Sequence, residues 1–300
     1  MTSLPDAGHP APPERPERPS GLDDGSGIPP WLPWTAPAAL FSALAAALVS
    51  GLIISLVGAA FGASLDDAPP AVLIASTIAQ DVCFVAVALL FAAMVVFPRP
   101  VHFGLRPPRS FWQVVGLIVG GYIAFIVISY VWLQIIGQPD EKDTVIQDLG
   151  GDDGTAALIA IAFVVAVCAP IAEEFLFRGY FYGALRRLGM WPAAALTGLA
   201  FGLVHVFGSP IAFIVPLGLL GMGLALLREK TRSLYPGIAL HSINNAFAFC
   251  SSVHWDWQLP FVLVGALSLI TLIVWLGLRF WPEPRKKIAT PAAPAPAPTG

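Results

Sequence analysis

The sequence predicts an all-α fold, a polytopic membrane bundle of about eight transmembrane helices with both termini in the cytosol. Three observations lead to this prediction. Hydrophobic residues make up 56% of the chain and charged residues only 12%, which is about half the charged share of an average soluble domain. Eight apolar runs approach or exceed the roughly 20 residues that cross a bilayer. Basic residues gather in alternate connections between these runs, as the positive-inside rule requires.

The elements follow one another with polar tails at either end. Residues 1–34 are rich in proline, glycine and charge, and they lack the apolar core of a signal peptide. We expect a disordered cytosolic tail there, and a second disordered tail in the Ala/Pro-rich residues 285–300. Between the tails, the membrane helices are expected at 38–62, 71–97, 111–136, 155–187, 191–208, 210–228, 235–253 and 258–281. The run at 191–208 is the shortest and the weakest candidate for a full span.

This division groups the helices into three parts. Residues 35–154 hold N-terminal membrane helices, 155–253 hold the polar residues that suggest chemistry, and 254–284 hold a last helix. Fourteen of the sixteen basic residues fall in segments that the topology places inside, whereas the segment at 140–154 is acidic and lies outside. The pattern predicts a multi-pass protein of the cell membrane, and the Ala/Pro/Gly bias favours a bacterial inner membrane. The net charge of −3 indicates no nucleic-acid partner.

Two glutamates and an arginine stand inside the apolar stretch CAPIAEEFLFRGYFYGALRRLG. Ionisable groups at such depth cost several kcal/mol unless they are paired or wetted. Glu174 and Arg178 are four residues apart, the spacing of an ion pair within one helix. We expect this pair to neutralise Arg178 and to leave Glu173, about 100° further round the helix, free to act as a base.

A helical hairpin is predicted to bring Glu173 close to His205. Its turn reads RRLGMWP, in which Gly189 suits a left-handed C-cap and Pro192 suits a first helical turn. Glu173 lies 16 residues before Gly189 and His205 lies 16 residues after it. The two side chains should therefore reach the same depth, although the rotation of each helix about its axis is not determined by the count.

A second polar group comes from the run at 235–253. His241 and Asn245 are four residues apart and share one helix face, while Asn244 should point elsewhere. His241 follows Pro236 so closely that it should lie shallower than Glu173. Either the preceding turn is sunk into the membrane or the site opens toward the cytosol, and both alternatives stay open.

Other intramembrane residues receive structural assignments. Asp81 should be hydrogen-bonded to a neighbouring helix, and Gly179 and Gly183 should allow close helix packing. The three cysteines show no disulfide or C-x-x-C spacing and are expected to be buried thiols. Seven tryptophans near predicted helix ends should anchor the protein at the membrane interfaces: Trp31, Trp34, Trp112, Trp191, Trp255, Trp257 and Trp281.

Three motifs within residues 155–253 resemble those of one protease family. EEFLFR, FGLVH and HSINN are similar, in order, to the E-E-x-x-x-R, F-x-x-x-H and H-x-x-x-N motifs of the CPBP intramembrane proteases. That family includes the type II CAAX prenyl endopeptidases and the bacterial Abi proteins. The resemblance implies a membrane endopeptidase with a cavity that opens to the cytosol and a membrane-associated protein or peptide as substrate. The residues that it implies are Glu173, Glu174, Arg178, His205, His241 and Asn245.

The resemblance also implies roles for these residues. Glu173 with His205 would activate a water, and His241 with Asn245 would hold the oxyanion, since a base within reach and preplaced donors are what amide hydrolysis needs. We expect no cofactor, because no H-E-x-x-H is present. Zinc held by Glu173, His205 and His241 with an open fourth position is the alternative, so the peptidase is glutamate-dependent or of the metallo type.

Two other functions remain as alternatives. A family member without activity would act as a membrane scaffold or a bacteriocin self-immunity factor. A transporter could use intramembrane Glu, His and Arg as a proton relay. Transporters often contain internal repeats, however, and here the polar residues cluster in one half of the chain without such a repeat.

Overall fold

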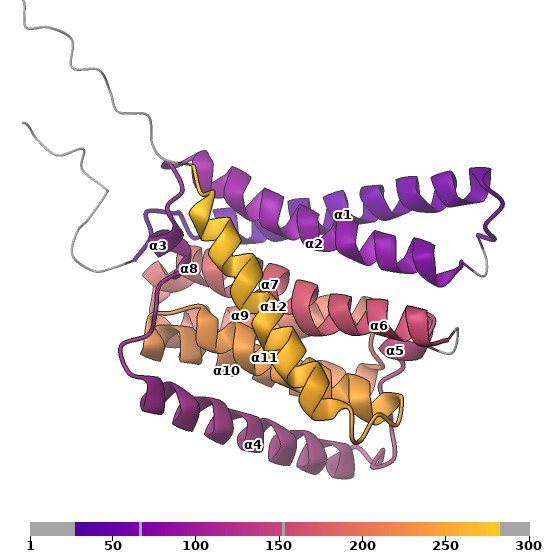
Figure 1. The fold of residues 1–300 in the computed structure, drawn as a ribbon. Coiled ribbons are helices and arrows are strands. Elements are labelled where there is room, and N and C mark those ends of the chain that lie inside the picture. The colour runs from indigo at the N-terminus through magenta and orange to yellow at the C-terminus, as the bar shows by residue number, and fades with distance from the viewer. Residues whose placement is uncertain (1–27, 66–67, 152–153, 283–300) are drawn as a thin grey trace, which may run out of the picture.

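The computed structural model describes residues 28–65, 68–151 and 154–282; residues 1–27 of the tail expected at 1–34 and the whole tail expected at 285–300 lie outside these ranges. Within them every regular element is helical (Figure 1). The predicted all-α fold is therefore confirmed. The first and last described residues emerge at the same end of the bundle (Figure 1), as an even number of crossings requires.

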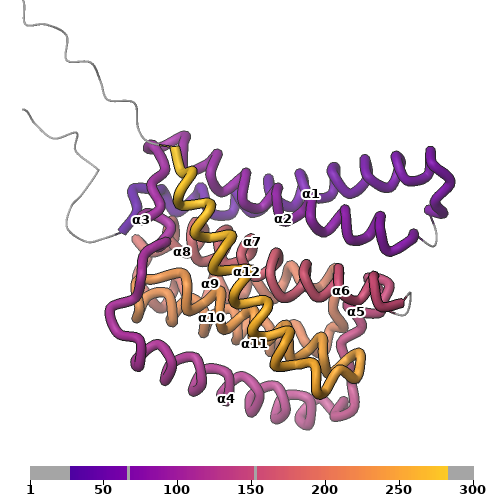
Figure 2. The backbone as a smooth tube through the Cα atoms, viewed as in Figure 1, coloured from indigo at the N-terminus to yellow at the C-terminus, as the bar shows by residue number. Residues whose placement is uncertain are grey.

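The outer helices enclose a central group. The helices α1 and α2 form a long hairpin on one side, α4 lies along the opposite side, and α12 crosses the bundle obliquely in the view of Figure 2. The outer elements and the two short helices beside them are α1 (Thr35–Ala60), α2 (Pro70–Ala93), α3 (Pro100–Phe103), α4 (Phe111–Ile135), α5 (Val145–Asp148) and α12 (Leu259–Arg279).

The central group carries the motifs and begins with one long, interrupted helix. Its elements are α6 (Thr155–Phe163), η1 (Val164–Cys168), α7 (Ala169–Glu174), η2 (Phe175–Phe181), α8 (Tyr182–Leu185) and η3 (Arg186–Leu188). The rest of the group is α9 (Met190–Val204), η4 (His205–Phe207), η5 (Ile211–Phe213), α10 (Ile214–Thr231) and α11 (Tyr235–Ser252).

Seven helical stretches in the described ranges are long and apolar enough to cross a membrane. The eighth predicted span, 235–253, forms the helix α11 but does not meet this standard of apolarity. The reason is its polar content, which includes His241, Ser242, Asn244 and Asn245. The predicted span at 191–208, the shortest of the eight, does meet the standard as the stretch Met190–Phe207. The helix α11 therefore differs from the other predicted spans in its polarity and not in its length.

The outer helices present a surface suited to lipid. Large apolar side chains such as Phe41, Leu48 and Trp112 are at least 70% exposed, and α4 buries none of its side chains. A soluble protein rarely exposes apolar surface on this scale. The surface supports the multi-pass membrane assignment.

The long helix from Thr155 to Leu188 contains two segments with wider hydrogen-bond spacing. The segments η1 and η2 are π-helical, and they flank the six residues of α7 that end at Glu174. Wide π-turns are rare and are frequently found at functional sites. Nothing in the sequence pattern had indicated them.

Glycines hold α9 directly against α10. A Cβ atom at Gly198 would lie 2.5 Å from the carbonyl oxygen of Gly218, and one at Gly202 would lie 2.6 Å from that of Ile214. Only hydrogen fits at these places, so the two backbones touch. Because His205 directly follows α9, this contact fixes the height at which its imidazole enters the bundle.

The segment 28–34 departs from the expected disordered tail. Trp31 is 0% exposed, and its ring packs on Phe103 and Tyr180 with centroid separations of 5.1 and 4.6 Å. The side chain fills space above Gly183, where a Cβ atom would lie 2.9 Å from the indole. Gly183 thus permits close packing as predicted, although its neighbour is an aromatic ring. Trp31 is a core residue and not an interfacial anchor, whereas Trp34 is exposed.

Candidate active site

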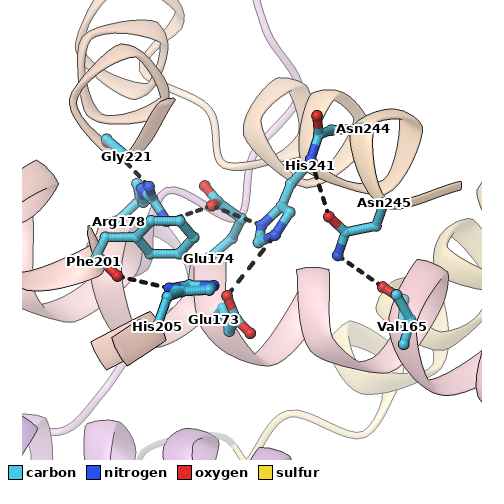
Figure 3. A network of polar contacts seen from close by, with 10 residues as sticks. All are labelled: Val165, Glu173, Glu174, Arg178, Phe201, His205, Gly221, His241, Asn244 and Asn245. Atoms are coloured by element: carbon cyan, nitrogen blue, oxygen red, sulfur yellow. Dashed lines mark hydrogen bonds and ion pairs between the residues drawn. The ribbon is translucent and has the colours of Figure 1, made fainter. Parts of the chain in front are cut away.

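The polar residues of the three motifs gather inside the bundle. Figure 3 shows side chains from α7, η2, the end of α9 and α11 converging on one cluster, and the α10 carbonyl of Gly221 joins them. Segments far apart in the chain therefore supply a single site.

The predicted ion pair between Glu174 and Arg178 is confirmed. The Arg178 Nη1 atom donates to Glu174 Oε1 at 2.6 Å, and both side chains are 0% exposed. Arg178 Nη2 donates to the carbonyl of Gly221 at 3.0 Å. A buried charge is tolerated only when it is paired and hydrogen-bonded in this way.

Glu174 also supports the candidate catalytic histidine of α11. Its Oε1 atom lies 3.3 Å from Nδ1 of His241, so one carboxylate oxygen serves both Arg178 and the imidazole. Gly237 makes this contact feasible, because a Cβ atom there would lie 2.6 Å from Glu174 Oε2. Gly237 and His241 are one helical turn apart and share a face. The four-residue spacing from His241 is the sequence signal that places Gly237 at the site.

Glu173 approaches the same imidazole from the other side. Its Oε2 atom lies 3.8 Å from Nε2 of His241, and its side chain is 14% exposed. This separation exceeds a direct hydrogen bond but leaves the two groups close enough for strong electrostatic interaction. His241 therefore lies between two carboxylates and not at a shallower level than Glu173. The expectation of a shallow His241 was wrong.

His205 enters the cluster at the end of α9. It is the C-cap of that helix and the first residue of the 3₁₀ segment η4. Its Nδ1 atom lies 2.7 Å from the carbonyl oxygen of Phe201, and since a carbonyl only accepts, Nδ1 carries the hydrogen. In the neutral ring Nε2 is then the basic nitrogen, and Figure 3 draws the ring pointing toward Glu173.

The predicted meeting of Glu173 and His205 takes a different form. Within the described ranges no hydrogen bond or ion pair joins the two side chains, and the ion-pair contact of Glu173 is with His241. Gly189 has a φ of 107° and a ψ of 159°, a conformation that suits glycine but lies outside the left-handed helical region of the expected cap. Pro192 lies in the first turn of α9 as predicted. The hairpin brings both residues to one site without a direct hydrogen bond between them.

Phe201 is the organising residue that the sequence reasoning left without a role. The guanidinium of Arg178 lies over its ring at 4.2 Å from the centroid, in a cation–π contact. The rings of His205 and His241 pack against it with centroid separations of 4.6 and 5.7 Å. Phe201 precedes His205 by one helical turn, and this shared face was the signal for its role.

Asn245 is held on the π-turn η1 and away from the glutamates. Its amide nitrogen donates to the carbonyl of Val165 at 2.9 Å, and Ser242 donates to the carbonyl of Ala166 at 2.6 Å. Asn244 turns back to donate to the Asn245 side-chain oxygen at 3.3 Å, and so does not point elsewhere as expected. One amide hydrogen of Asn245 remains for another acceptor.

Asp81 contradicts its structural assignment. The side chain is 5% exposed, and neither carboxylate oxygen has a hydrogen-bond partner among the described residues. It is therefore not hydrogen-bonded to a neighbouring helix. Buried carboxylates without partners are rare in native proteins and call for an explanation.

The fit of the site to zinc was tested on its donors. In the described part of the chain no group of three or more His, Cys, Asp and Glu side chains is arranged to hold a metal ion. The Nδ1 atoms of His205 and His241 lie against a carbonyl and Glu174, so Nε2 of each ring is the nitrogen that could bind a metal. The three donors are not gathered into a tetrahedral zinc site as they stand.

The comparisons with known proteins agree with the motifs. Residues 155–247 match the family model described as Rce1-like, type II CAAX prenyl endopeptidase. No curated protein and no solved structure matched the chain. The match covers all three motifs and every candidate site residue from Glu173 to Asn245. Residues 155–247 are thus similar to the Rce1-like family of type II CAAX prenyl endopeptidases, in agreement with the CPBP relationship that the motifs predicted.

Proposed function

We propose that the protein is an intramembrane endopeptidase that hydrolyses a peptide bond of a membrane-associated protein or peptide. The observation that carries the proposal is the position of Glu173. Its partly accessible carboxylate lies 3.8 Å from a histidine inside an apolar bundle, within a domain that matches a peptidase family. A carboxylate with a histidine at this depth is a functional arrangement, because ionisable groups in membranes are otherwise avoided.

Glu173 is the proposed general base. It removes a proton from a water molecule, whose oxygen then attacks the scissile carbonyl carbon. The same carboxyl group returns that proton to the leaving nitrogen as the C–N bond breaks. His205 assists by accepting a hydrogen bond from the water at Nε2, the nitrogen left basic by the Nδ1 contact with Phe201.

His241 and Asn245 are the proposed oxyanion donors. The Nε2 atom of His241 is the proposed donor to the oxyanion, and its Nδ1 atom lies 3.3 Å from Glu174 Oε1, which orients the ring. Asn245 contributes the amide hydrogen that Val165 does not use. Preplaced donors in a dry site stabilise a developing negative charge far more than donors in water do. Glu174 and Arg178 hold His241 in place.

The proposed reaction uses no metal ion. The chemistry of a glutamate base with two histidines and an amide is sufficient for hydrolysis, and among the described residues Glu173, His205 and His241 are not gathered as a set of three metal ligands. We also place the protein in a bacterial inner membrane with both ends in the cytosol. The charge pattern supports that orientation.

The test compares membrane proteomes from cells that carry the wild-type protein or its Glu173→Gln variant. We expect peptides that are trimmed in wild-type cells to remain full-length in the variant. Purified proteins are then assayed on internally quenched peptides that contain the recovered sequence, and on matched C-A-A-X peptides with and without a prenyl group. Glu229→Gln is the control, because Glu229 pairs with Arg186 outside the site.

Three outcomes would decide against the proposal or in favour of an alternative. Equal cleavage by wild type and Glu173→Gln would refute the assignment of the base. No trimming difference, together with a cellular phenotype that Glu173→Gln retains, would favour the scaffold or self-immunity function. Uptake of a solute without proteolysis would favour the transporter.

A further inference from the structure

The buried carboxyl group of Asp81 has no role in the mechanism described so far. It lies 11 residues after the start of α2, which places it about 17 Å along the helix and near the middle of a hydrocarbon core about 30 Å thick. An ionised carboxylate there is costly. With neither oxygen hydrogen-bonded to a described residue, the charge would have no compensation.

Asp81 lies on a helix that packs beside the proposed hydrolytic base. The helix α2 packs against α7 and η1, and Asp81 lies within electrostatic range of Glu173 and of the Cys168 thiol. The Oε2 atom of Glu173 is likewise buried and has no hydrogen-bond partner in the described ranges. A protonated Asp81 thus lacks an acceptor for its hydrogen bond, and the neighbouring Glu173 carboxylate lacks a donor.

The surroundings of Asp81 offer no cation to neutralise it. The segments most closely packed on α2 are α1, α6, η1, α7 and η2. Among them α1 and α6 carry no ionisable side chain, and Arg178 of η2 is paired with Glu174. Tyr180 of η2 donates to Thr35. The remaining groups are Cys168 and Glu173, and neither supplies a positive charge.

We propose that Asp81 is a positioning residue for Glu173: its neutral carboxyl group donates a hydrogen bond, directly or through one water, to the Glu173 carboxylate. Two carboxyl groups held close together in an apolar site share one proton, because both cannot be ionised. The donated hydrogen bond orients Glu173 and keeps it ionised and ready to accept a proton from water. The inference rests on the proposed function, in which Glu173 is the base.

The test uses two substitutions that differ in their ability to donate. Asp81→Asn keeps a neutral donor of nearly the same shape, whereas Asp81→Leu removes it. We expect Asp81→Asn to retain most of the wild-type kcat. Asp81→Leu should lower kcat by about tenfold or more, which is the usual effect of losing a hydrogen bond to a charged group. Cys83→Ala is the control, because Cys83 lies two residues along α2 and contacts Ser50 of α1.

The pH profile separates positioning from a merely structural role. Without the donor, the Glu173 carboxylate is less stabilised, so its ionisation moves to higher pH. The acid limb of the kcat profile of Asp81→Leu should therefore rise by about one pH unit for a tenfold weaker stabilisation. An unmoved limb would mean a structural role only, and a limb at lower pH would mean an ionised Asp81. Either result overturns the proposal, as would equal losses in the two variants.

Infrared spectroscopy gives a readout that does not depend on activity. The wild-type protein at neutral pH should show the carbonyl band of a protonated carboxylic acid, and Asp81→Asn should lack it. A band that persists unchanged in the variant would contradict a neutral Asp81. Failure of the endopeptidase proposal appears separately, as cleavage that survives Glu173→Gln.

Discussion

Replacing Glu174 by glutamine tests the division of labour between the adjacent glutamates. The substitution preserves shape but leaves the guanidinium of Arg178, which is 0% exposed, without its counter-ion at 2.6 Å. Breaking a buried ion pair from one side typically costs about 3–5 kcal/mol. We expect a loss of that order in the free energy of unfolding, measured by denaturant titration in detergent. Glu173→Gln should cost far less, because Glu173 makes no such contact.

A double variant shows whether the loss comes from the uncompensated charge. Arg178→Met alone removes the cation and its bond to the Gly221 carbonyl. In the combination Glu174→Gln with Arg178→Met neither charge remains, so the total loss should be well below the sum of the single losses. Glu229→Gln is the matched control, because its partner Arg186 is 25% exposed and partly exposed pairs contribute only about 0–1 kcal/mol.

Two results would refute this reasoning. One is a loss for Glu174→Gln no larger than that of Glu229→Gln. The other is strict additivity in the double variant, which would mean that the two charges do not depend on each other. Glu174→Gln should also lower activity, since the same oxygen lies 3.3 Å from His241. A complete separation into one purely structural and one purely catalytic glutamate is therefore not expected.

Three further predictions concern packing, topology and metal. Gly202→Ala should destabilise the protein by about 1–3 kcal/mol through overpacking against α10, whereas Gly223→Ala, with nothing within 4 Å of its Cβ position, should be neutral in thermal unfolding; equal effects would refute the backbone contact. In a cysteine-free background, a membrane-impermeant maleimide added outside should label a cysteine at Asp148 but not one at Arg106, and the reverse pattern would invert the topology. Chelators should leave the purified enzyme active, and activity lost on chelation and restored by one equivalent of zinc would favour the metallo type.

The helices and the local ion pair could be predicted because both depend on one-dimensional spacing. Apolar length and basic residues located the helices, and the four-residue spacing paired Glu174 with Arg178. The exception was α11, where length alone suggested a span although its polar residues reduce its apolarity. Spacing along one helix determines which residues share a face, and that is why these assignments held.

Contacts between helices could not be predicted in the same way. They depend on the rotation of each helix, and the π-turns η1 and η2 change that rotation without a compositional signal. Glu173 was therefore assigned to His205, while its ion-pair contact is with His241. The assignment of Trp31 was wrong for another reason. The polar composition of residues 1–34 predicted a disordered tail, and composition does not indicate that a single aromatic side chain in it packs against Gly183.

The polarity of α11 has a consequence for how this helix is held in the bundle. A segment with His241, Ser242 and two asparagines partitions into lipid less readily than its neighbours. Its side chains find acceptors on η1 and a carboxylate on α7. The contacts that build the site are therefore also the contacts that hold this polar helix against the apolar helices around it.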